Sequence, residues 1–442
     1  MTYGLLRPGQ VVFAEESRLA CRIGDLLGGG GQGEVYRAEL GGETVAVKWY
    51  RTAVASSAQR QALEELVRRG TPSPAFLWPM DIVTAPRTQA FGYVMPIRDY
   101  RFVGMSELVR RRVEPTARVL AGVGLGLAEA FLLLHAQGLC YRDISFGNAF
   151  FDPDTGEVLV CDNDNVAIDG SALGGVLGTP RFMAPEVVRG EALPSSRTDL
   201  FSLAVLLFMM LFVHHPFEGA REHETGLLDL RAMRSLYGEH PVFVFDPADD
   251  SNRPVPGAQQ NVIDLWALYP RFLHELFTRS FTLGARDPVD GRVRESQWRQ
   301  AMARLRDSVL ACDSCGGDAE VFWDPSEPWS DLSCWRCHAR LRAPIVLELD
   351  TGASLLASPG AELFGHHVVP GRLYDFSVRV GEVVRHPTQA GVVGLRNVSE
   401  RSWHVRASTG SAQEVPPGKS VRIAPGSIID FGPSSALARA GA

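Results

Sequence analysis

The sequence lacks the excess of positive charge that nucleic-acid-binding proteins usually carry. Its 442 residues include 44 lysines and arginines against 51 aspartates and glutamates, which gives a net charge of −7. The start of the chain has no charged segment followed by an apolar run, so we expect no secretory signal. The longest apolar run, residues 200–213, is too short to span a membrane and predicts a buried helix. These absences predict a cytoplasmic protein with neither a nucleic-acid nor a membrane partner.

Cysteine is also scarce, and the seven cysteines do not suggest a disulfide framework. Four of them form two CxxC pairs, Cys312 with Cys315 and Cys334 with Cys337, separated by eighteen residues. Each pair can occupy a tight turn that directs two thiolates at one ion, and four thiolates make a closed, tetrahedral zinc site. The spacing is typical of a zinc ribbon. The alternative is a redox-active dithiol.

The length predicts two or three domains, and the composition is that of a globular protein, with 45% hydrophobic and 21% charged residues. The stretch of residues 140–164 organises the first of these domains. It places Asp143 five residues before Asn148, and Asp162 follows a short hairpin. Phosphoryl transfer from ATP needs a carboxylate that orients the acceptor hydroxyl, and an amide oxygen and a second carboxylate that hold Mg²⁺.

Upstream, a glycine-rich segment has the form G-x-G-x-x-G-x-V, with Gly28, Gly30, Gly33 and Val35 at the fixed positions. Glycines let backbone amides approach phosphate oxygens closely, although a flexible turn would show the same residues. An alternating strand follows and ends in Lys48. The order of these motifs predicts a phosphate-binding hairpin followed by a lysine that contacts the phosphates.

Together these motifs resemble those of a eukaryotic-type protein kinase. The resemblance implies that Asp143 orients the acceptor hydroxyl, that Asn148 and Asp162 hold Mg²⁺, and that Lys48 pairs with the α- and β-phosphates of ATP. It also implies a glutamate that braces the lysine, for which we favour Glu64, ten residues before Pro74, over its neighbour Glu65.

The adenine pocket follows from the same resemblance. Residues 92–97 resemble the strand that enters the hinge between the two lobes. Met95 would then lie beside the adenine and Ile97 would offer backbone contacts. Val35 and Ala46, with Lys48, would complete the nucleotide-binding residues.

The second lobe continues the pattern. Residues 178–186 resemble the end of an activation segment, and Asp199 opens the expected buried helix. Arg292 is the expected ion-pair partner of Glu186. The connection at residues 219–261 is rich in Asp, Pro and Gly and predicts an exposed loop.

Four positions depart from the kinase pattern. Tyr141 replaces a histidine, and Ser145 replaces a lysine that helps to hold the γ-phosphate; Asn163 and Asp164 stand where phenylalanine and glycine are usual. Because Asp164 has no counterpart in the motif, we expect a glycine there to preserve ATP binding and transfer. These departures motivate an alternative, a pseudokinase scaffold that assembles partners. A small-molecule phosphotransferase is a third possibility, which the peptide-binding character of residues 178–186 disfavours.

Two segments of the sequence resemble a narrower group of kinases. The first is ISFGNAFFDP followed by VCDNDNV, and the second is DLFSLAVLLFMMLFVHHPFEG. They are similar to the bacterial kinases of the TerY-phosphorylation triad. This resemblance implies a von Willebrand-type protein and a metal-dependent protein phosphatase as partners.

From residue 345 the pattern changes to short alternating strands such as IVLEL, FSVRV, GVVGLRNV, WHVRA, SVRIA and SIIDFG, with Gly and Pro turns between them. This pattern predicts an all-β sandwich. Its closing run resembles a forkhead-associated (FHA) domain, which implies a phosphothreonine peptide as a partner. A degenerate sandwich that binds no phosphate is an equal alternative.

The predicted architecture is therefore α+β. A two-lobed protein kinase fold occupies residues 1–309, with the N-lobe at 1–97 and the C-lobe at 98–309, followed by a zinc ribbon at 310–343 and an FHA-like sandwich at 344–442. The predicted function is an ATP-dependent protein serine/threonine kinase of bacterial signalling or stress response. Its expected cofactors are ATP, Mg²⁺ and a structural Zn²⁺.

Overall fold

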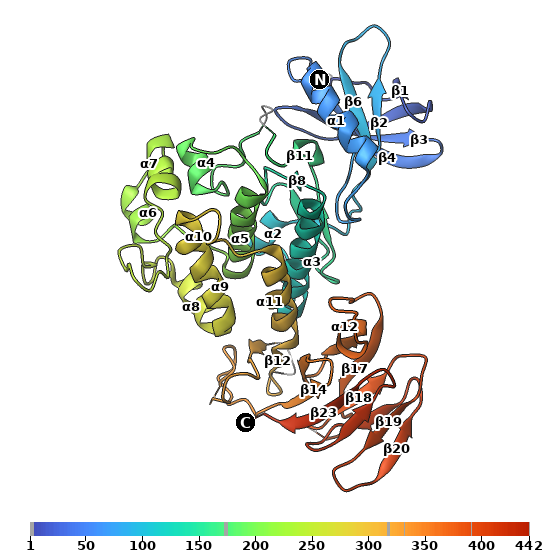
Figure 1. Ribbon diagram of the computed structural model, residues 1–442, viewed down its shortest axis with the longest axis vertical. Coiled ribbons are helices and arrows are strands. Elements are labelled where there is room, and N and C mark those ends of the chain that lie inside the picture. The colour runs from blue at the N-terminus through green and yellow to red at the C-terminus, as the bar shows by residue number, and fades with distance from the viewer. Residues whose placement is uncertain (1–3, 172–175, 316–318, 331, 390, 442) are drawn as a thin grey trace. The chain divides into compact units, whose positions relative to one another are not determined.

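The computed structural model describes residues 4–171, 176–315, 319–330, 332–389 and 391–441 (Figure 1). Its contacts divide the chain into two compact units. The first unit comprises Met1–Pro115, Val123–Leu265 and Glu275–Arg299, and the second comprises Thr116–Gly122, Trp266–His274 and Gln300–Ala442.

The first unit begins with a closed six-strand barrel in the order β1-β2-β3-β4-β6-β5, drawn in blue in Figure 1. The strands are β1 (Val11–Ala14), β2 (Ala20–Gly29), β3 (Gly33–Leu40), β4 (Glu43–Tyr50), β5 (Asp81–Thr84) and β6 (Phe91–Pro96). Helix α1 (Ser57–Arg69) is capped by the Ser56 side chain and ends at Gly70, whose φ of 73° suits glycine. It buries Leu63 and Leu66, as its apolar spacing predicts.

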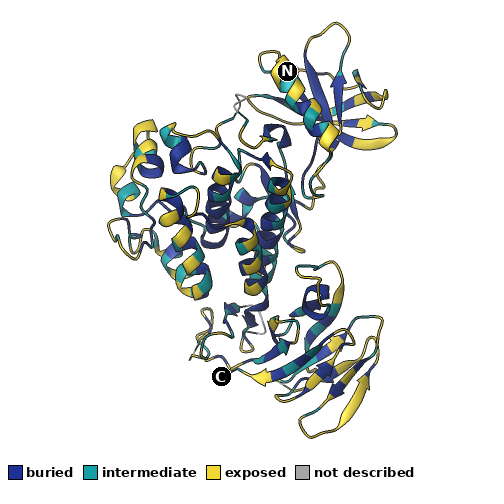
Figure 2. Cartoon of the chain, in the orientation of Figure 1, coloured by how far each residue is buried: buried dark blue, intermediate teal, exposed yellow. Residues whose placement is uncertain are grey.

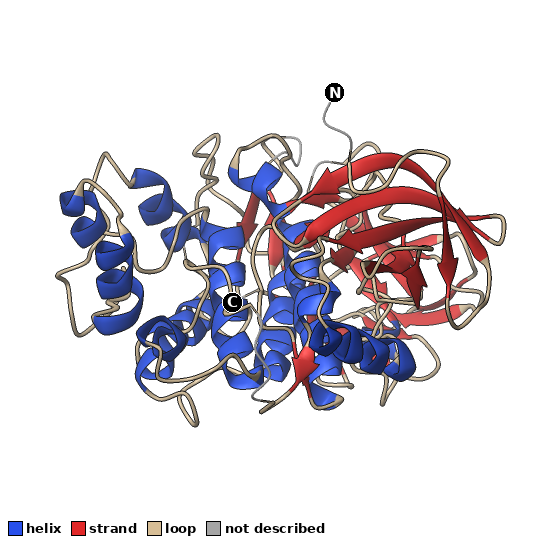
Figure 3. Ribbon diagram, turned by 90° about the horizontal axis from the view of Figure 1, so that it is seen from above, coloured by secondary structure: helices blue, strands red, loops and turns tan. Residues whose placement is uncertain are grey.

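Helices dominate the rest of the first unit (Figure 3). Its core element is α5 (Ser196–Phe212), which a reciprocal capping box between Ser195 and Thr198 starts and which is almost entirely buried, as predicted (Figure 2). The other helices of the described chain up to residue 307 are α2 (Met105–Val109), α3 (Ala117–Ala136), α4 (Pro185–Arg189), α6 (Ala220–Thr225), α7 (Leu230–Arg234), α8 (Gln260–Leu268), α9 (Arg271–Phe281), α10 (Leu283–Arg286) and α11 (Glu295–Asp307).

Helix α3 is long and apolar enough to cross a membrane by length and composition, and half of its most apolar window is buried inside the protein. The core helix of a globular lobe has the same composition, so this finding is weak evidence for a membrane span.

Short hairpins carry the residues of the central stretch. They are built from β7 (Val103–Gly104), β8 (Leu139–Cys140), β9 (Ala149–Phe151), β10 (Val158–Val160) and β11 (Ala167–Ile168). Between β10 and β11 lies the single 3₁₀ turn η1 (Asn163–Asn165). Asp162 precedes this turn with a left-handed φ of 51°.

The expectation of an exposed loop at residues 219–261 is partly wrong. Helices α6 and α7 and the π-turn η2 (Ser235–Glu239) occupy its first half. In the second half the buried Asn252 donates from Nδ2 to the carbonyls of Phe217 at 3.0 Å and Val242 at 2.7 Å. These bonds satisfy backbone groups that a free loop would leave to water, and so they hold the segment in place.

The second unit is rich in strands. A six-stranded antiparallel sheet has the order β15-β14-β23-β22-β19-β20, and a four-stranded sheet has the order β16-β17-β18-β21. Apolar residues of both sheets form one core around Trp403 and Leu395. The strands are β12 (Val309–Ala311), β13 (Glu320–Phe322), β14 (Ile345–Leu349), β15 (Ser354–Leu356), β16 (Glu362–Phe364), β17 (Arg379–Arg385), β18 (Val393–Asn397), β19 (Trp403–Arg406), β20 (Ala412–Val415), β21 (Ser420–Arg422), β22 (Ile428–Asp430) and β23 (Ser435–Ala440).

The sequence pattern missed strands β15, β16, β20 and β23 and the short helix α12 (Gly365–Val368), and it began β17 three residues early. These strands are short or have mixed polarity, so they lack a clear alternation.

Candidate phosphotransfer site and metal centre

The loop around Asp143 is held in one orientation by hydrogen bonds on both carboxylate oxygens. Thr179 Oγ1 donates to Asp143 Oδ1 at 2.7 Å, and Asn148 Nδ2 donates to Asp143 Oδ2 at 3.1 Å and to its carbonyl at 2.8 Å. Burial raises the pKa of Asp143, although the bonds from Thr179 and Asn148 oppose this shift. Because both amide hydrogens of Asn148 face Asp143, its Oδ1 is left as an oxygen ligand for a cation.

A buried cluster below this loop fixes its backbone. Asp199 of α5 accepts from the amide of Arg142 at 2.9 Å and from the amide of Tyr141. His135 of α3 lies between Asp199 and Glu295. Burial opposes its protonation, but hydrogen bonds to the two carboxylates raise the pKa of His135 to about 9. No sequence motif marks this histidine, because its partners are distant in the chain.

Two of the departures from the kinase pattern fill structural roles. Tyr141 is fully buried, packs edge-on against Phe131 with ring centroids 5.6 Å apart, and donates its hydroxyl to the carbonyl of Cys161. Asn163 is also fully buried; its Nδ2 donates to the carbonyl of Val160 at 3.0 Å, while its Oδ1 has no partner among the described residues. Both side chains therefore belong to the interior rather than to the nucleotide cleft.

The glycine-rich segment spans the end of β2 and the start of β3. A Cβ on Gly33 would lie 2.2 Å from the carbonyl oxygen of Trp49, so this glycine is required by the close approach of β4. At Gly28 and Gly30 a Cβ would meet nothing within 4 Å. These two positions therefore leave the backbone open, as a phosphate-binding loop requires.

The structure brings the predicted adenine-pocket residues together. Ala46 of β4 pairs with Met95 of β6, and both belong to one apolar cluster. Val35 and Ile97 pack against the same cluster and are partly buried.

Lys48 is buried, with 4% of its surface exposed, and its ammonium group has three acceptors among the described residues. They are Asp164 Oδ1 at 2.8 Å, Gln32 Oε1 at 3.1 Å and Asp162 Oδ1 at 3.5 Å. The ammonium group carries three hydrogens, so its donor capacity is fully used. Burial opposes the charge, but the two aspartates outweigh it and raise the pKa of Lys48.

The expected pairing of Glu64 with Lys48 is not present. Glu64 is half-exposed and pairs with Arg60 at 3.0 Å, while Glu65 pairs with Arg68 and Arg69. Among the described residues, no glutamate of α1 contacts Lys48. The physical reason is the helical phase, because Leu63 and Leu66 occupy the buried face and turn both glutamates outward.

The helix residue that does face the cleft is Gln59. Its Nε2 donates to Tyr50 Oη at 3.3 Å and to the carbonyl of Asp164 at 3.5 Å.

The expectation that Asp164 is dispensable does not fit its surroundings. Its side chain is fully buried and accepts from Lys48, from Tyr50 Oη at 2.6 Å and from Tyr93 Oη at 3.1 Å. The left-handed turn at Asp162 and the 3₁₀ turn η1 direct it inward. The available sequence signal was the pair of tyrosines in apolar strands, since buried phenols need a polar partner.

The expected pairing of Glu186 with Arg292 is confirmed. Arg292 Nη2 donates to both carboxylate oxygens of Glu186 at 2.8 Å. The guanidinium group also donates to the carbonyls of Gly284 at 3.1 Å and Arg197 at 2.6 Å.

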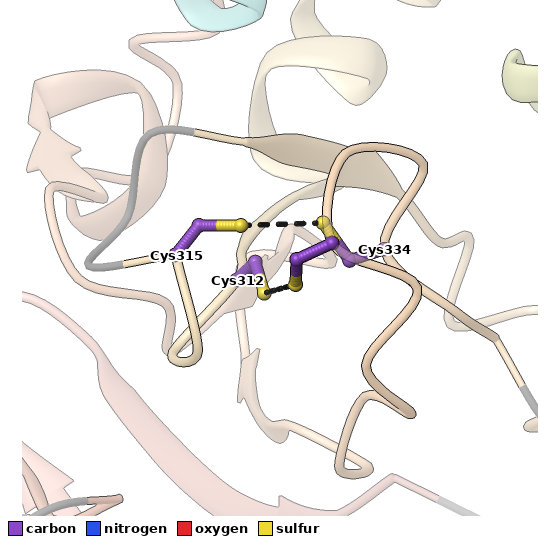
Figure 4. Close-up of side chains that lie close together, drawn as sticks. Cys312, Cys315 and Cys334 are labelled. Carbon is purple, nitrogen blue, oxygen red and sulfur yellow. Dashed lines mark hydrogen bonds between the residues drawn. The ribbon is translucent and has the colours of Figure 1, made fainter.

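The four CxxC cysteines converge in the second unit. The sulfur atoms of Cys312 and Cys337 lie 3.8 Å apart, and those of Cys315 and Cys334 lie 3.7 Å apart (Figure 4). A tetrahedral zinc ion with Zn–S bonds of about 2.3 Å separates its sulfur ligands by about 3.8 Å. The thiols present therefore fit a four-thiolate zinc centre.

Without a cation, the surroundings of Cys315 and Cys334 shift the pKa values of these two thiols in opposite directions. The hydrogen bond with Cys337 raises the pKa of Cys315 to about 12. Burial raises the pKa of Cys334, but amide hydrogen bonds from Cys337 and Arg336 lower it overall to about 7. A divalent cation would supply the charge that lets all four thiols ionise.

A second cluster of metal-ligand types, Asp307 with His366 and His367, does not fit a metal. The amides of Tyr374 and Phe364 donate to Nδ1 of His366 and His367, each at 2.9 Å. An Nδ1 that accepts a hydrogen bond leaves the proton on Nε2 in the neutral ring, so Nε2 has no lone pair for a cation. Nε2 of His367 instead donates to Asp307 at 3.2 Å. This cluster ties α12 to the end of α11.

Comparison with known proteins supports the reading of the first unit. The family model of the protein kinase domain matches residues 21–265. The chain belongs to the protein kinase family.

Individual relatives carry protein kinase names, and two of the following three are named as serine/threonine kinases. The DNA damage-responsive serine/threonine-protein kinase RqkA of Deinococcus radiodurans is 28% identical, over 60% of this chain and 38% of its own length. CBL-interacting protein kinase 4 of Oryza sativa is 32% identical over 51% of each chain. The serine/threonine-protein kinase AfsK of Streptomyces coelicolor is 28% identical, over 48% of this chain and 27% of its own length.

The chain thus spans between 27% and 51% of the length of these three relatives. The family match confirms the prediction of a protein kinase domain, and serine/threonine specificity is stated in the names of two of these relatives.

Proposed function

We propose that this chain is an ATP-dependent protein serine/threonine kinase of bacterial signalling that acts in the cytoplasm. The observation that carries the proposal is the grouping of Asp143, fixed by Asn148 and Thr179, with Lys48 beside Asp162 in one unit. The named activities of its relatives support it.

The residues present suit the expected cofactors. Bound ATP and Mg²⁺ supply the phosphoryl group and the positive charge that neutralises it. Asn148 Oδ1 and Asp162, whose side chain is 45% exposed, are the oxygen ligands that Mg²⁺ prefers. Gly28 and Gly30 leave room for phosphate at the loop, and Lys48 places a fixed positive charge beside it.

In this proposal Asp143 accepts a hydrogen bond from the serine or threonine hydroxyl of a protein substrate. Because Thr179 and Asn148 each hold one of its oxygens, the carboxylate is oriented before the substrate arrives, which lowers the entropic cost of alignment. Ser145 leaves the γ-phosphate without the second cation that many kinases provide.

We propose further that residues 310–343 form a structural zinc ribbon and that residues 344–442 form an FHA-like sandwich. The sulfur geometry supports the first, and the shared core of the two sheets supports the second. A phosphothreonine peptide, a von Willebrand-type protein and a metal-dependent phosphatase are candidate partners on the sequence resemblance alone.

The test is transfer of label from γ-labelled ATP with Mg²⁺ to serine and threonine peptides. Asp143→Asn is expected to lower the rate about 10²- to 10⁴-fold and to keep ATP binding, since it removes the orienting carboxylate and little volume. Asp154→Asn, at an exposed turn, is the matched control. Because burial raises the pKa of Asp143, the rate should fall on acidification before an exposed aspartate would protonate.

Binding of ATP by the parent without any transfer, under every divalent metal tried, would replace the kinase by the scaffold alternative.

A further inference from the structure

The ammonium group of Lys48 lies between the strands of the barrel and the segment that carries Asp162. On the barrel side its neighbour is Gln32, a neutral amide. On the other side it meets two carboxylates that differ in exposure. The side chain of Asp162 is 45% exposed, whereas that of Asp164 is fully buried.

We propose that Asp164 is the positioning residue for Lys48, in the role that the sequence pattern assigned to a glutamate of α1. The inference rests on the proposed function, and it assigns to a residue outside the motif a part in phosphate binding. The buried carboxylate of Asp164 is 2.8 Å from the ammonium group, the shortest of the three contacts of Lys48.

The different roles of Asp164 and Asp162 follow from their distances to Lys48. Lys48 Nζ is 2.8 Å from Asp164 and 3.5 Å from Asp162. When Asp162 binds a cation, its negative charge is neutralised by that cation. Lys48 then keeps Asp164 as its carboxylate partner. Asp164 is therefore the partner that remains while Lys48 contacts phosphate.

The surroundings of Asp164 are built to keep it in place. Tyr50 of β4 donates to Oδ2 and Tyr93 of β6 donates to Oδ1. Burial, together with the charge of Asp164, raises the pKa of both phenols well above their usual range, so they stay protonated donors. These bonds tie the segment after Asp162 to the same barrel that carries Lys48.

Residue usage agrees with this role. The chain holds two lysines, Lys48 and Lys419, among 44 basic residues. At Lys48 three separate acceptors surround one point charge, a geometry that a planar guanidinium group would not match.

The first test measures Lys48 itself in the protein without nucleotide. With ¹⁵N-labelled lysine, the two side-chain amines give two signals, and Lys419 is the internal control. Asp164→Asn, which keeps the volume but removes the charge, should shift the side-chain signal of Lys48 and leave that of Lys419 unchanged. An unshifted Lys48 signal would overturn the assigned pairing.

The second test measures binding of ATP with Mg²⁺ by calorimetry. Asp164→Asn should weaken it about 10- to 100-fold, because a charged hydrogen bond that positions Lys48 is lost. Tyr50→Phe removes a donor to the same carboxylate but no charge, and should change affinity much less. Unchanged affinity for ATP in Asp164→Asn would mean that Asp164 has only a structural role. Tighter binding would mean that the Lys48–Asp164 pair inhibits ATP binding. Either result overturns the proposal.

A third variant guards against loss of folding. Gln59 reaches Tyr50 Oη and the carbonyl of Asp164, so Gln59→Glu brings a carboxylate from α1 toward the same pocket. Combined with Asp164→Asn, it should recover part of the lost affinity, and failure to recover any would contradict a role based on charge.

Asp143→Asn separates the two proposals, because it should lower the transfer rate about 10²- to 10⁴-fold and preserve ATP binding. A parent that binds ATP but transfers nothing would defeat the kinase proposal and leave the binding test of Asp164 valid. A parent that binds no nucleotide would overturn both.

Discussion

Two buried ion pairs in the first unit have opposite characters. Arg292 meets Glu186 through one nitrogen at 2.8 Å from both carboxylate oxygens, and two backbone carbonyls bind the rest of its guanidinium group. Lys48 meets Asp164 at 2.8 Å but keeps a longer contact, 3.5 Å, to the half-exposed Asp162. The arginine pair is closed, whereas the lysine pair can exchange one partner.

The difference shows that buried ion pairs in the same unit of the chain can have two roles, one in stability and one in binding. A planar guanidinium group with several fixed acceptors locks two segments together, whereas an ammonium group is a compact charge that tolerates a change of partner. We therefore expect the arginine pair to control stability and the lysine pair to control phosphate binding.

The largest expected effect concerns the zinc centre. Like the arginine pair, its four thiolates and one cation would form a closed cluster of charges that holds segments together. Cys334→Ser should lose the zinc and unfold residues 310–343, because metal binding in small four-ligand sites contributes roughly 10–16 kcal/mol. Metal analysis of reduced protein should find one zinc per chain in the parent. Cys161→Ser, in the first unit, is the control that should keep the zinc. Parent protein purified without zinc would refute the site.

Breaking the closed pair comes next. Arg292→Met leaves Glu186 buried without a counter-ion, so the free energy of unfolding should fall by about 3–5 kcal/mol. Urea denaturation measures this change, with the exposed Arg294→Met as its control. A fall in the free energy of unfolding of less than about 1 kcal/mol would mean that this pair contributes no more than a surface salt bridge. The contrast with Lys48 would then not hold.

The smallest expected effect is a pH dependence at His135, which lies between two carboxylates as Lys48 does. Hydrogen bonds to Asp199 and Glu295 overcome burial and raise its pKa from 6.5 to about 9. The folded protein therefore binds the proton more tightly, and this contributes about 3 kcal/mol that is fully present below pH 6.5 and lost as the pH rises toward 9.

His135→Gln should flatten the fall in stability across that interval, and His404→Gln, at an exposed position, should leave it intact. Equilibrium unfolding at a series of pH values makes the comparison. A parent whose stability does not fall between pH 6.5 and 9 would refute the charged histidine.

Motif order predicted most of the first unit from the sequence, because the kinase pattern fixes residue types at sites where chemistry permits few substitutes. It also predicted the pairing of Glu186 with Arg292, and the spacing of the two CxxC pairs predicted the convergence of the four cysteines. It failed at Glu64, because proximity to a motif position does not give helical phase, and the phase of α1 is set by the packing of Leu63 and Leu66.

Asp164 shows the other limit of sequence reasoning. In the sequence, Asp164 follows the expected Asp162 by two residues and looks like part of a turn. Only the tertiary arrangement brings Tyr50, Tyr93 and Lys48 to it. The C-terminal strands show a third limit, since short strands with mixed polarity leave a weak alternation signal.

The most direct measurement of the central contrast is the rise in melting temperature that ATP with Mg²⁺ produces in each variant. A ligand present at 100 times its Kd stabilises a protein by about 2.7 kcal/mol, so the rise reports binding even when a variant is less stable. We predict that Arg292→Met melts at a lower temperature and keeps the rise, whereas Asp164→Asn loses most of it. A full rise in Asp164→Asn, or its loss in Arg292→Met alone, would contradict the assignment of phosphate binding to the lysine pair.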